Sequence, residues 1–231
     1  MSLRDNFDKI SKSVENAVEN AGRAKGSVKL IAVSKTVDSS KIREMYGFGA
    51  RDFAESRPQV LRDKIKELET LNDIKWHFIG HLQSNKIKYV YPVVALVHSI
   101  DRRELLDEFA VWAQKTGKKC PVLLEVHISG EEAKQGFEVS EVLTVIKDYK
   151  DSANLDIRGL MGMAPLDADE EQIRICFKKL HDLFTASKEF EGSAYKAQEL
   201  SMGMSGDFPV AIAEGATMVR IGTSLFKTDS K

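Results

Sequence analysis

Apolar residues recur at steps of three and four along the start of the chain, the spacing of one face of an amphipathic helix. Ser2 and Asp5 precede this stripe at the spacing of a capping box, which marks a helix start. The residues that follow the spacing are Phe7, Ile10, Val14, Ala17 and Ala21. We therefore predict a helix over about residues 2–22.

A second pattern, of short and nearly continuous apolar runs rich in β-branched residues, begins at Val28. Its first example, VKLIAVS over 28–34, is typical of a strand that is covered on both faces. Helical patterns separate the later runs, for example an apolar stripe over 173–184. The further predicted strands cover residues 51–55, 75–80, 95–100, 121–128, 157–163, 199–204 and 217–222.

Several helices between these runs have recognisable starts. A helix over about 38–47 follows the first strand, and Pro58 suits the first position of the next helix. Asp101 and Glu104 stand at the spacing of a capping box ahead of another apolar stripe. The charges over 64–69 alternate at helical spacing, which predicts a solvent-facing surface.

Strands that alternate with helices over short connections predict an all-parallel sheet with crossover helices. At 231 residues, the chain has the length at which such a sheet closes into one barrel. We predict the α/β class and a single (β/α)8 TIM barrel over 1–231, with strand–helix units over about 28–226 behind the extra N-terminal helix. An open doubly wound sheet is the alternative, but no Gly-x-Gly-x-x-Gly follows the first strand.

Composition and charge exclude several classes of partner. The 34 lysines and arginines nearly equal the 35 aspartates and glutamates, and no basic stripe contains interleaved aromatic residues, so we expect no binding to nucleic acid. The polar N-terminus lacks the apolar core of a signal peptide, and no apolar run reaches membrane-spanning length. We therefore expect a cytoplasmic protein that contacts no membrane.

Cysteines and histidines give no sign of a metal site. Cys120 and Cys176 lie far apart in sequence and outside any metal-ligand spacing, which fits a reducing compartment. His77 and His81 are four residues apart, but Gly80 and the strand pattern argue against the helical geometry that places two histidines on one metal. We expect no metal.

A lysine follows the first predicted strand, and barrel proteins carry their functional side chains at the carboxyl ends of the strands. We expect the amine of Lys35 to be buried beside the barrel core, which would favour the neutral form that attacks an aldehyde. A solvated lysine at a strand end is the alternative, and position alone slightly favours it.

The last two predicted strands lead into loops rich in small residues, hydroxyls and exposed N–H groups. Residues 200–207 run toward a helix that begins near Phe208, and residues 219–224 contain Gly222 and Thr223. In a barrel these two loops are neighbours and commonly hold a phosphate group. Tight turns alone would also explain the glycines.

Arg220 stands in the otherwise apolar last strand, where a permanent charge needs a partner or a function. Because that strand closes against the first, Arg220 and Lys35 could face one pocket. Against a pyridine ring, an arginine can only donate to the ring nitrogen, so that nitrogen would stay unprotonated. A salt bridge to a buried carboxylate such as Glu125 is the other interpretation, and both stay open.

Ordered motifs extend along nearly the whole chain. They are 31–36 (IAVSKT), 77–86 (HFIGHLQSNK), 98–101 (HSID), 134–137 (KQGF), 159–161 (GLM), 200–205 (LSMGMS) and 220–223 (RIGT). In these motifs the chain resembles the pyridoxal 5′-phosphate (PLP) homeostasis proteins, barrels similar to the N-terminal domain of alanine racemase. It departs from the family's frequent Asn-Tyr-x-Gln-Glu element around Ser56, and it has Lys227 where a glycine is common.

The resemblance implies that Lys35 holds PLP as a Schiff base and that Arg220 faces the pyridine nitrogen. The residues that it implies for the phosphate are Ser205, Gly222 and Thr223. The further cofactor contacts that it implies are Ser201, Met204 and Ser56.

The implied function is control of the free PLP supply, and through it of vitamin B6 and amino-acid balance, with PLP-dependent apo-enzymes as recipients and without turnover. A racemase of this fold needs a second base from a separate domain of a partner subunit, whereas this chain stops just after the last strand and we expect a monomer. A PLP-dependent amino-acid racemase or lyase that uses Lys35 as its base is the alternative. A PLP-free barrel isomerase of a phosphorylated sugar or amine is a third hypothesis.

Overall fold

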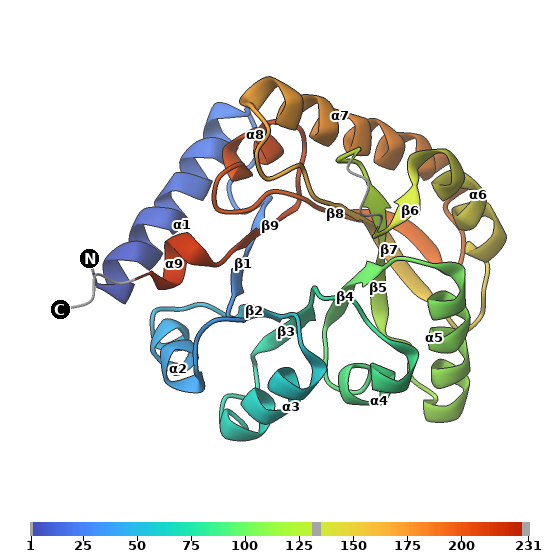
Figure 1. Cartoon of the computed structure of the whole chain (residues 1–231), viewed down its shortest axis with the longest axis horizontal. Coiled ribbons are helices and arrows are strands. Elements are labelled where there is room, and N and C mark those ends of the chain that lie inside the picture. The colour runs from blue at the N-terminus through green and yellow to red at the C-terminus, as the bar shows by residue number, and fades with distance from the viewer. Residues whose placement is uncertain (1, 131–134, 228–231) are drawn as a thin grey trace.

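The predicted apolar runs form parallel strands around the centre of the molecule (Figure 1). The computed structural model describes residues 2–130 and 135–227. The barrel strands, in order around it, are β1 (Lys29–Val33), β2 (Asp52–Glu55), β3 (Lys75–Phe78), β4 (Leu96–Ile100), β5 (Pro121–His127), β7 (Asp156–Gly162), β8 (Tyr195–Ser201) and β9 (Met218–Ile221). Because β4 pairs with β5 and β9 pairs with β1, the sheet closes into the predicted barrel.

Two details of the sheet differ from the prediction. A two-residue strand, β6 (Phe137–Glu138), pairs with β5, and so short a strand leaves no apolar run in the sequence. Strand β8 begins earlier than the predicted 199–204, and it also ends earlier because the chain turns at Gly203, whose φ is +93°. A Cβ at Gly203 would lie 2.6 Å from that of Ala211, so this turn requires glycine.

Helices surround the barrel on its outside (Figure 1). They are α1 (Leu3–Asn20), α2 (Ser39–Gly47), α3 (Pro58–Glu67), α4 (Ile87–Val90), α5 (Arg103–Thr116), α6 (Val139–Tyr149), α7 (Glu170–Ser187), α8 (Phe208–Ala213) and α9 (Thr223–Phe226), with 3₁₀ turns η1 (Ser84–Lys86) and η2 (Lys188–Phe190). Helix α1 is the predicted extra helix, and Ser2 and Asp5 form its predicted capping box. Among the described residues, no helix has both the length and the apolar character needed to cross a bilayer.

Helix α1 connects the beginning of the described chain to its end. The Asn6 Nδ2 group donates to the carbonyl oxygens of Leu225, at 3.2 Å, and Lys227, at 2.8 Å. Near the other end of the helix, Arg23 Nη1 donates to the carbonyl oxygen of Ala216 at 2.7 Å. The extra helix therefore holds the segment around the last barrel strand in place.

The predicted capping box at Asp101 is wrong. Helix α5 begins after Arg102, whose side chain makes no capping hydrogen bond. The Asp101 carboxylate instead accepts from Arg102 Nη1 at 2.6 Å and lies 2.9 Å from His81 Nδ1. These two basic side chains occupy the oxygens that a cap would need, and the spacing of Asp101 and Glu104 could not reveal them.

Side chains that alternate along the strands fill two cores. The larger core lies between the barrel and its helices, and the smaller one lies inside the barrel. The smaller core consists of Ile31, Val33, Ala54, Leu96, Leu123, Met161 and Met218. Its apolar character keeps water away from polar groups that share the barrel interior, which strengthens their mutual interactions.

Candidate functional site

The predicted site residues follow four barrel strands that lie side by side. Strands β2, β1, β9 and β8 are consecutive in the sheet, and all run in the same direction. Their carboxyl ends therefore meet at one end of the barrel. The predicted residues on the loops after these strands are Lys35, Ser56, Met204, Ser205, Gly222 and Thr223.

Lys35 lies on the loop after β1, and its side chain is exposed. The prediction of a buried amine is therefore wrong. The amide of Ser34 still continues the strand ladder by donating to the carbonyl oxygen of Ala54 at 3.0 Å, but the chain then turns at Lys35. This turn carries the lysine out of the packed core. The Lys35 amine makes no hydrogen bond or ion pair with any described residue, so it is accessible to a ligand at the rim.

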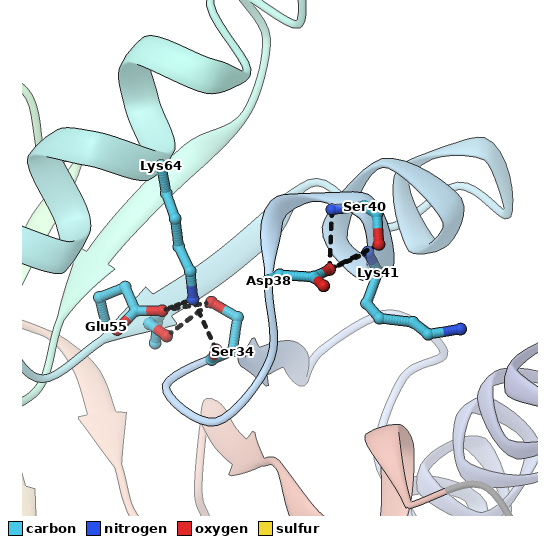
Figure 2. Close-up of polar contacts among 7 residues, drawn as sticks. Ser34, Asp38, Ser40, Lys41, Glu55 and Lys64 are labelled. Carbon is cyan, nitrogen blue, oxygen red and sulfur yellow. Dashed lines mark hydrogen bonds and ion pairs between the residues drawn. The ribbon is translucent and has the colours of Figure 1, made fainter.

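A buried ion pair fixes the residue before Lys35 (Figure 2). The amine of Lys64, on α3, binds the Glu55 carboxylate at the end of β2 and donates to the Ser34 carbonyl oxygen at 2.7 Å. The Ser34 hydroxyl also donates to Glu55, at 2.9 Å. Lys64 is 6% exposed, so the predicted solvent-facing surface over 64–69 is wrong at this position. The fully buried Glu55 requires a cation, and α3 supplies it.

The other end of the Lys35 loop is fixed by a helix cap. Asp38 accepts hydrogen bonds from the amides of Ser40, at 3.0 Å, and Lys41, at 3.2 Å, and so begins helix α2 (Figure 2). The loop from Ser34 to Asp38 is thus held on both sides of Lys35. A short loop with two fixed ends limits the positions that the lysine backbone can take, although its side chain is exposed.

The loops after β8 and β9 contact each other beside β1. The amide of Ser224 donates to the Ser205 hydroxyl at 3.5 Å, and Thr223 opens the short helix α9. A Cβ at Gly222 would lie 3.1 Å from the carbonyl oxygen of Val33, so glycine lets the end of β9 pack closely against β1. Hydroxyl and N–H groups of this kind are suited to an anion, and the phosphate site expected on these two loops stays a prediction.

Arg220 lies inside the barrel, 4% exposed, on β9. Its Nη1 group donates to the Ser201 hydroxyl at 2.6 Å, and its Nη2 group donates to the Gly162 carbonyl oxygen at 3.2 Å. No described carboxylate lies within ion-pair distance, so the alternative salt bridge to Glu125 is not formed. Burial lowers the pKa of Arg220 to about 10, with Glu125 and Asp207 opposing the shift, and the guanidinium stays charged at neutral pH.

The sequence prediction missed a set of polar side chains inside the barrel. Ser201, which accepts from Arg220, also lies 2.9 Å from His98 Nδ1. His98 Nε2 lies 2.9 Å from His77 Nδ1, and His77 Nε2 lies 3.0 Å from Asp52 Oδ1. Only the polar positions within the predicted strands hinted at this set. Among the described residues, no group of three or more potential ligands could hold a metal.

The polar groups at this end of the barrel differ in what they can bind. The Lys35 amine is a nucleophile, Arg220 is a donor without a carboxylate partner, and the loops after β8 and β9 supply anion-binding groups. Met204 and Ser56 are half-buried on their loops, whereas Ser201 is fully buried at the end of β8. The set suits a small anionic ligand with a carbonyl carbon and a hydrogen-bond acceptor.

Comparison with known proteins identifies relatives of this chain and the family to which they belong. The sequence model of the family described as alanine racemase, N-terminal domain, matches residues 6–230. A pyridoxal phosphate homeostasis protein of Aquifex aeolicus is 40% identical over 226 residues, which cover 98% of each chain.

Solved structures of similar proteins have the same fold as this chain. An unknown protein from Bifidobacterium adolescentis has a TM-score of 0.92 at 34% identity, covering 97% of this chain and 94% of that one. PipY of Synechococcus elongatus, solved with PLP bound, has a TM-score of 0.81 at 31% identity, covering 93% of this chain and 100% of PipY. This chain therefore belongs to the pyridoxal phosphate homeostasis proteins, within the family of the alanine racemase N-terminal domain.

Proposed function

We propose that this protein binds PLP at the carboxyl end of its barrel, as a Schiff base on Lys35, and acts in PLP and amino-acid homeostasis. The observation that carries this proposal is the grouping of an accessible amine, a buried arginine without a carboxylate partner and two anion-binding loops on neighbouring strands. The homeostasis proteins that it resembles, and PipY with its bound PLP, support the same ligand.

Each part of the ligand has a candidate partner in this chain. Ser205, Gly222 and Thr223 would hold the phosphate through hydroxyl and N–H groups. Arg220 would donate to the ring nitrogen while Ser201 holds its guanidinium. Met204 and Ser56 would border the ring from their loops.

The arginine favours a carrier over an enzyme. When bound, PLP supplies an aldehyde for an amine and a ring that can accept electron density. Arg220 has only donors, so it would keep the ring nitrogen unprotonated and make the ring a weaker electron acceptor. Such a site would hold the cofactor but would stabilise a substrate carbanion poorly. We therefore favour reversible storage, with transfer of PLP to PLP-dependent apo-enzymes.

Titration with PLP tests the binding site. We expect the protein to develop an absorption band of protein-bound PLP, and Lys35→Ala to abolish this band. Lys41→Ala is the matched control, because Lys41 is a partly exposed lysine a few residues further along whose amine pairs with Glu44. Equal bands in the Lys35→Ala and unmodified proteins would refute the proposed attachment.

Exchange of α-protons into deuterated solvent separates the carrier from the enzyme. The PLP-loaded protein should show no exchange above that of free PLP across a panel of amino acids. Exchange at enzymatic rates for any one of them would instead favour a racemase or lyase.

A further inference from the structure

Five polar side chains form one hydrogen-bonded row through the barrel interior, which we name the polar row. It consists of Asp52 on β2, His77 on β3, His98 on β4, Ser201 on β8 and Arg220 on β9. Strands β4 and β8 are not neighbours in the sheet, so the contact between His98 and Ser201 crosses the barrel. The row starts at the amino end of β2 and ends at the arginine of the candidate site.

Burial isolates the row from water except at its aspartate. His98 and Ser201 are fully buried, and His77 and Arg220 are 2% and 4% exposed. The Asp52 side chain is 16% exposed and also lies 3.9 Å from the Lys29 amine. A buried polar group that lacks a partner is costly, so each member of the row depends on its neighbours.

The chemistry of the two ends determines the direction of every hydrogen bond between them. At one end, Arg220 can only donate, so the Ser201 oxygen accepts from it and the Ser201 hydrogen is free to point to His98 Nδ1. At the other end, an ionised Asp52 can only accept, so His77 carries its hydrogen on Nε2. With both rings neutral, His98 Nε2 must then donate to His77 Nδ1. His98 Nδ1 is then an acceptor and receives the Ser201 hydrogen, which is compatible with the donor-only arginine at the other end.

The surroundings keep the rings neutral and the aspartate ionised. Burial lowers the pKa of His77 and lowers that of His98 well below its usual range. Burial alone would raise the pKa of Asp52, but the hydrogen bond from His77 and the nearby positive charges outweigh it and leave that pKa below its usual value. A single proton arrangement therefore joins a guanidinium to a carboxylate across the barrel.

We propose that Asp52, His77 and His98 are positioning residues that act through Ser201 on Arg220 and set the hydrogen bond that Arg220 offers to the ring nitrogen. This inference rests on the proposed PLP site. With its hydrogen directed to His98, the Ser201 hydroxyl presents only acceptor lone pairs to Arg220. A change at Asp52, at the opposite end of the barrel, thus alters how the guanidinium is held beside the cofactor.

Histidine NMR tests the row without any cofactor. In ¹⁵N spectra of the PLP-free protein at neutral pH, His77 and His98 should both be neutral with the hydrogen on Nε2. Exposed His81 serves as the internal reference for a histidine outside the row. A hydrogen on Nδ1 of His77 or His98, or a charged ring at either position, would overturn the proposed direction.

Variants test whether the row reaches the cofactor. Ser201→Ala removes the acceptor of a charged donor and should weaken PLP binding about tenfold and shift the absorption maximum of bound PLP. Ser201→Thr keeps a hydroxyl and should restore both. Asp52→Asn keeps an acceptor but removes the charge, and we expect a smaller loss of about threefold with the same direction of spectral shift. Asp182→Asn, on the exposed face of α7, is the matched charge control and should change neither.

The outcomes separate this inference from the proposed function. If the unmodified protein binds no PLP, the proposed function fails while the histidine spectra still report on the row. If the unmodified protein binds PLP but folded Asp52→Asn and Ser201→Ala leave affinity and absorption unchanged, the positioning role is wrong and the proposed function stands. Asp52 lies at the amino end of β2 and is partly exposed, and asparagine has nearly the same shape as aspartate. Asp52→Asn should therefore fold, and it tests the row even if Ser201→Ala does not fold.

Discussion

At the scale of single residues, Glu125 is a carboxyl group whose surroundings favour its protonated form. It lies on β5 and is 4% exposed. Burial, together with the charge of Asp101, raises its pKa to about 7, although Arg220 opposes the shift. The folded protein therefore binds this proton more tightly than the unfolded chain does.

The consequence is a loss of stability with rising pH. The contribution of Glu125 is fully present below about pH 4.5 and is lost as the pH rises to about 7. We expect the free energy of unfolding of the unmodified protein to fall by about 3 kcal/mol relative to Glu125→Gln over this range. Urea unfolding of both proteins at a series of pH values measures the difference. Parallel curves would contradict the raised pKa.

The site shows what single residues reveal before a structure is known. Lys35, Ser205 and Gly222 could be proposed from strand ends and family motifs, because those features are local in the sequence. His98 and Asp52 could not, because their contacts depend on the register of strands that are distant in the chain. The sequence left the exposure of Lys35 open between two interpretations, since it results from one turn after β1.

At the scale of elements, the ion pair between Lys64 on α3 and Glu55 on β2 holds the start of the Lys35 loop. Lys64→Met would leave a carboxylate fully buried without its cation, and we expect a loss of about 3–5 kcal/mol in the free energy of unfolding. Lys66→Met, at an exposed position of the same helix, is the control and should cost less than about 1 kcal/mol.

A double variant separates the buried charge from lost packing. Lys64→Met combined with Glu55→Gln removes both charges and should recover much of the stability lost by Lys64→Met alone. Chemical denaturation of the single, double and control variants measures this. A Lys64→Met protein as stable as the Lys66→Met control would contradict the structural role of the pair.

The elements themselves were largely predictable, for physical reasons. A strand covered on both faces is mostly apolar, so the runs at β1 and β5 were visible. The two-residue β6 has no such signal, and the end of β8 depends on the turn at Gly203. The burial of Lys64 on α3 was also hidden, because Lys64 pairs with a residue from another element.

At the scale of the whole molecule, α1 holds the segment that follows the last barrel strand through the side chain of Asn6. This side chain is 3% exposed and donates to the carbonyl oxygens of Leu225 and Lys227. Asn6→Ala would leave two acceptors without their donor, and we expect a loss of about 1–3 kcal/mol in the free energy of unfolding.

Asn16→Ala is the matched control, because Asn16 is exposed on the same helix. Alanine favours a helix, so this variant should be neutral or slightly more stable. The midpoints of thermal unfolding of the two variants and of the unmodified protein measure the difference. A similar midpoint for the two would show that α1 does not hold the barrel through Asn6.

The proposed function depends on the chemistry of one exposed lysine, so the most direct test identifies the residue that carries the cofactor. The PLP-loaded protein is reduced with borohydride, digested and mapped by mass spectrometry, with Lys35→Ala treated in parallel. We predict that the mass of reduced, covalently attached PLP is found on the peptide containing Lys35 and is absent from the variant. Attachment at another lysine, or equal labelling of the variant, would contradict the assignment.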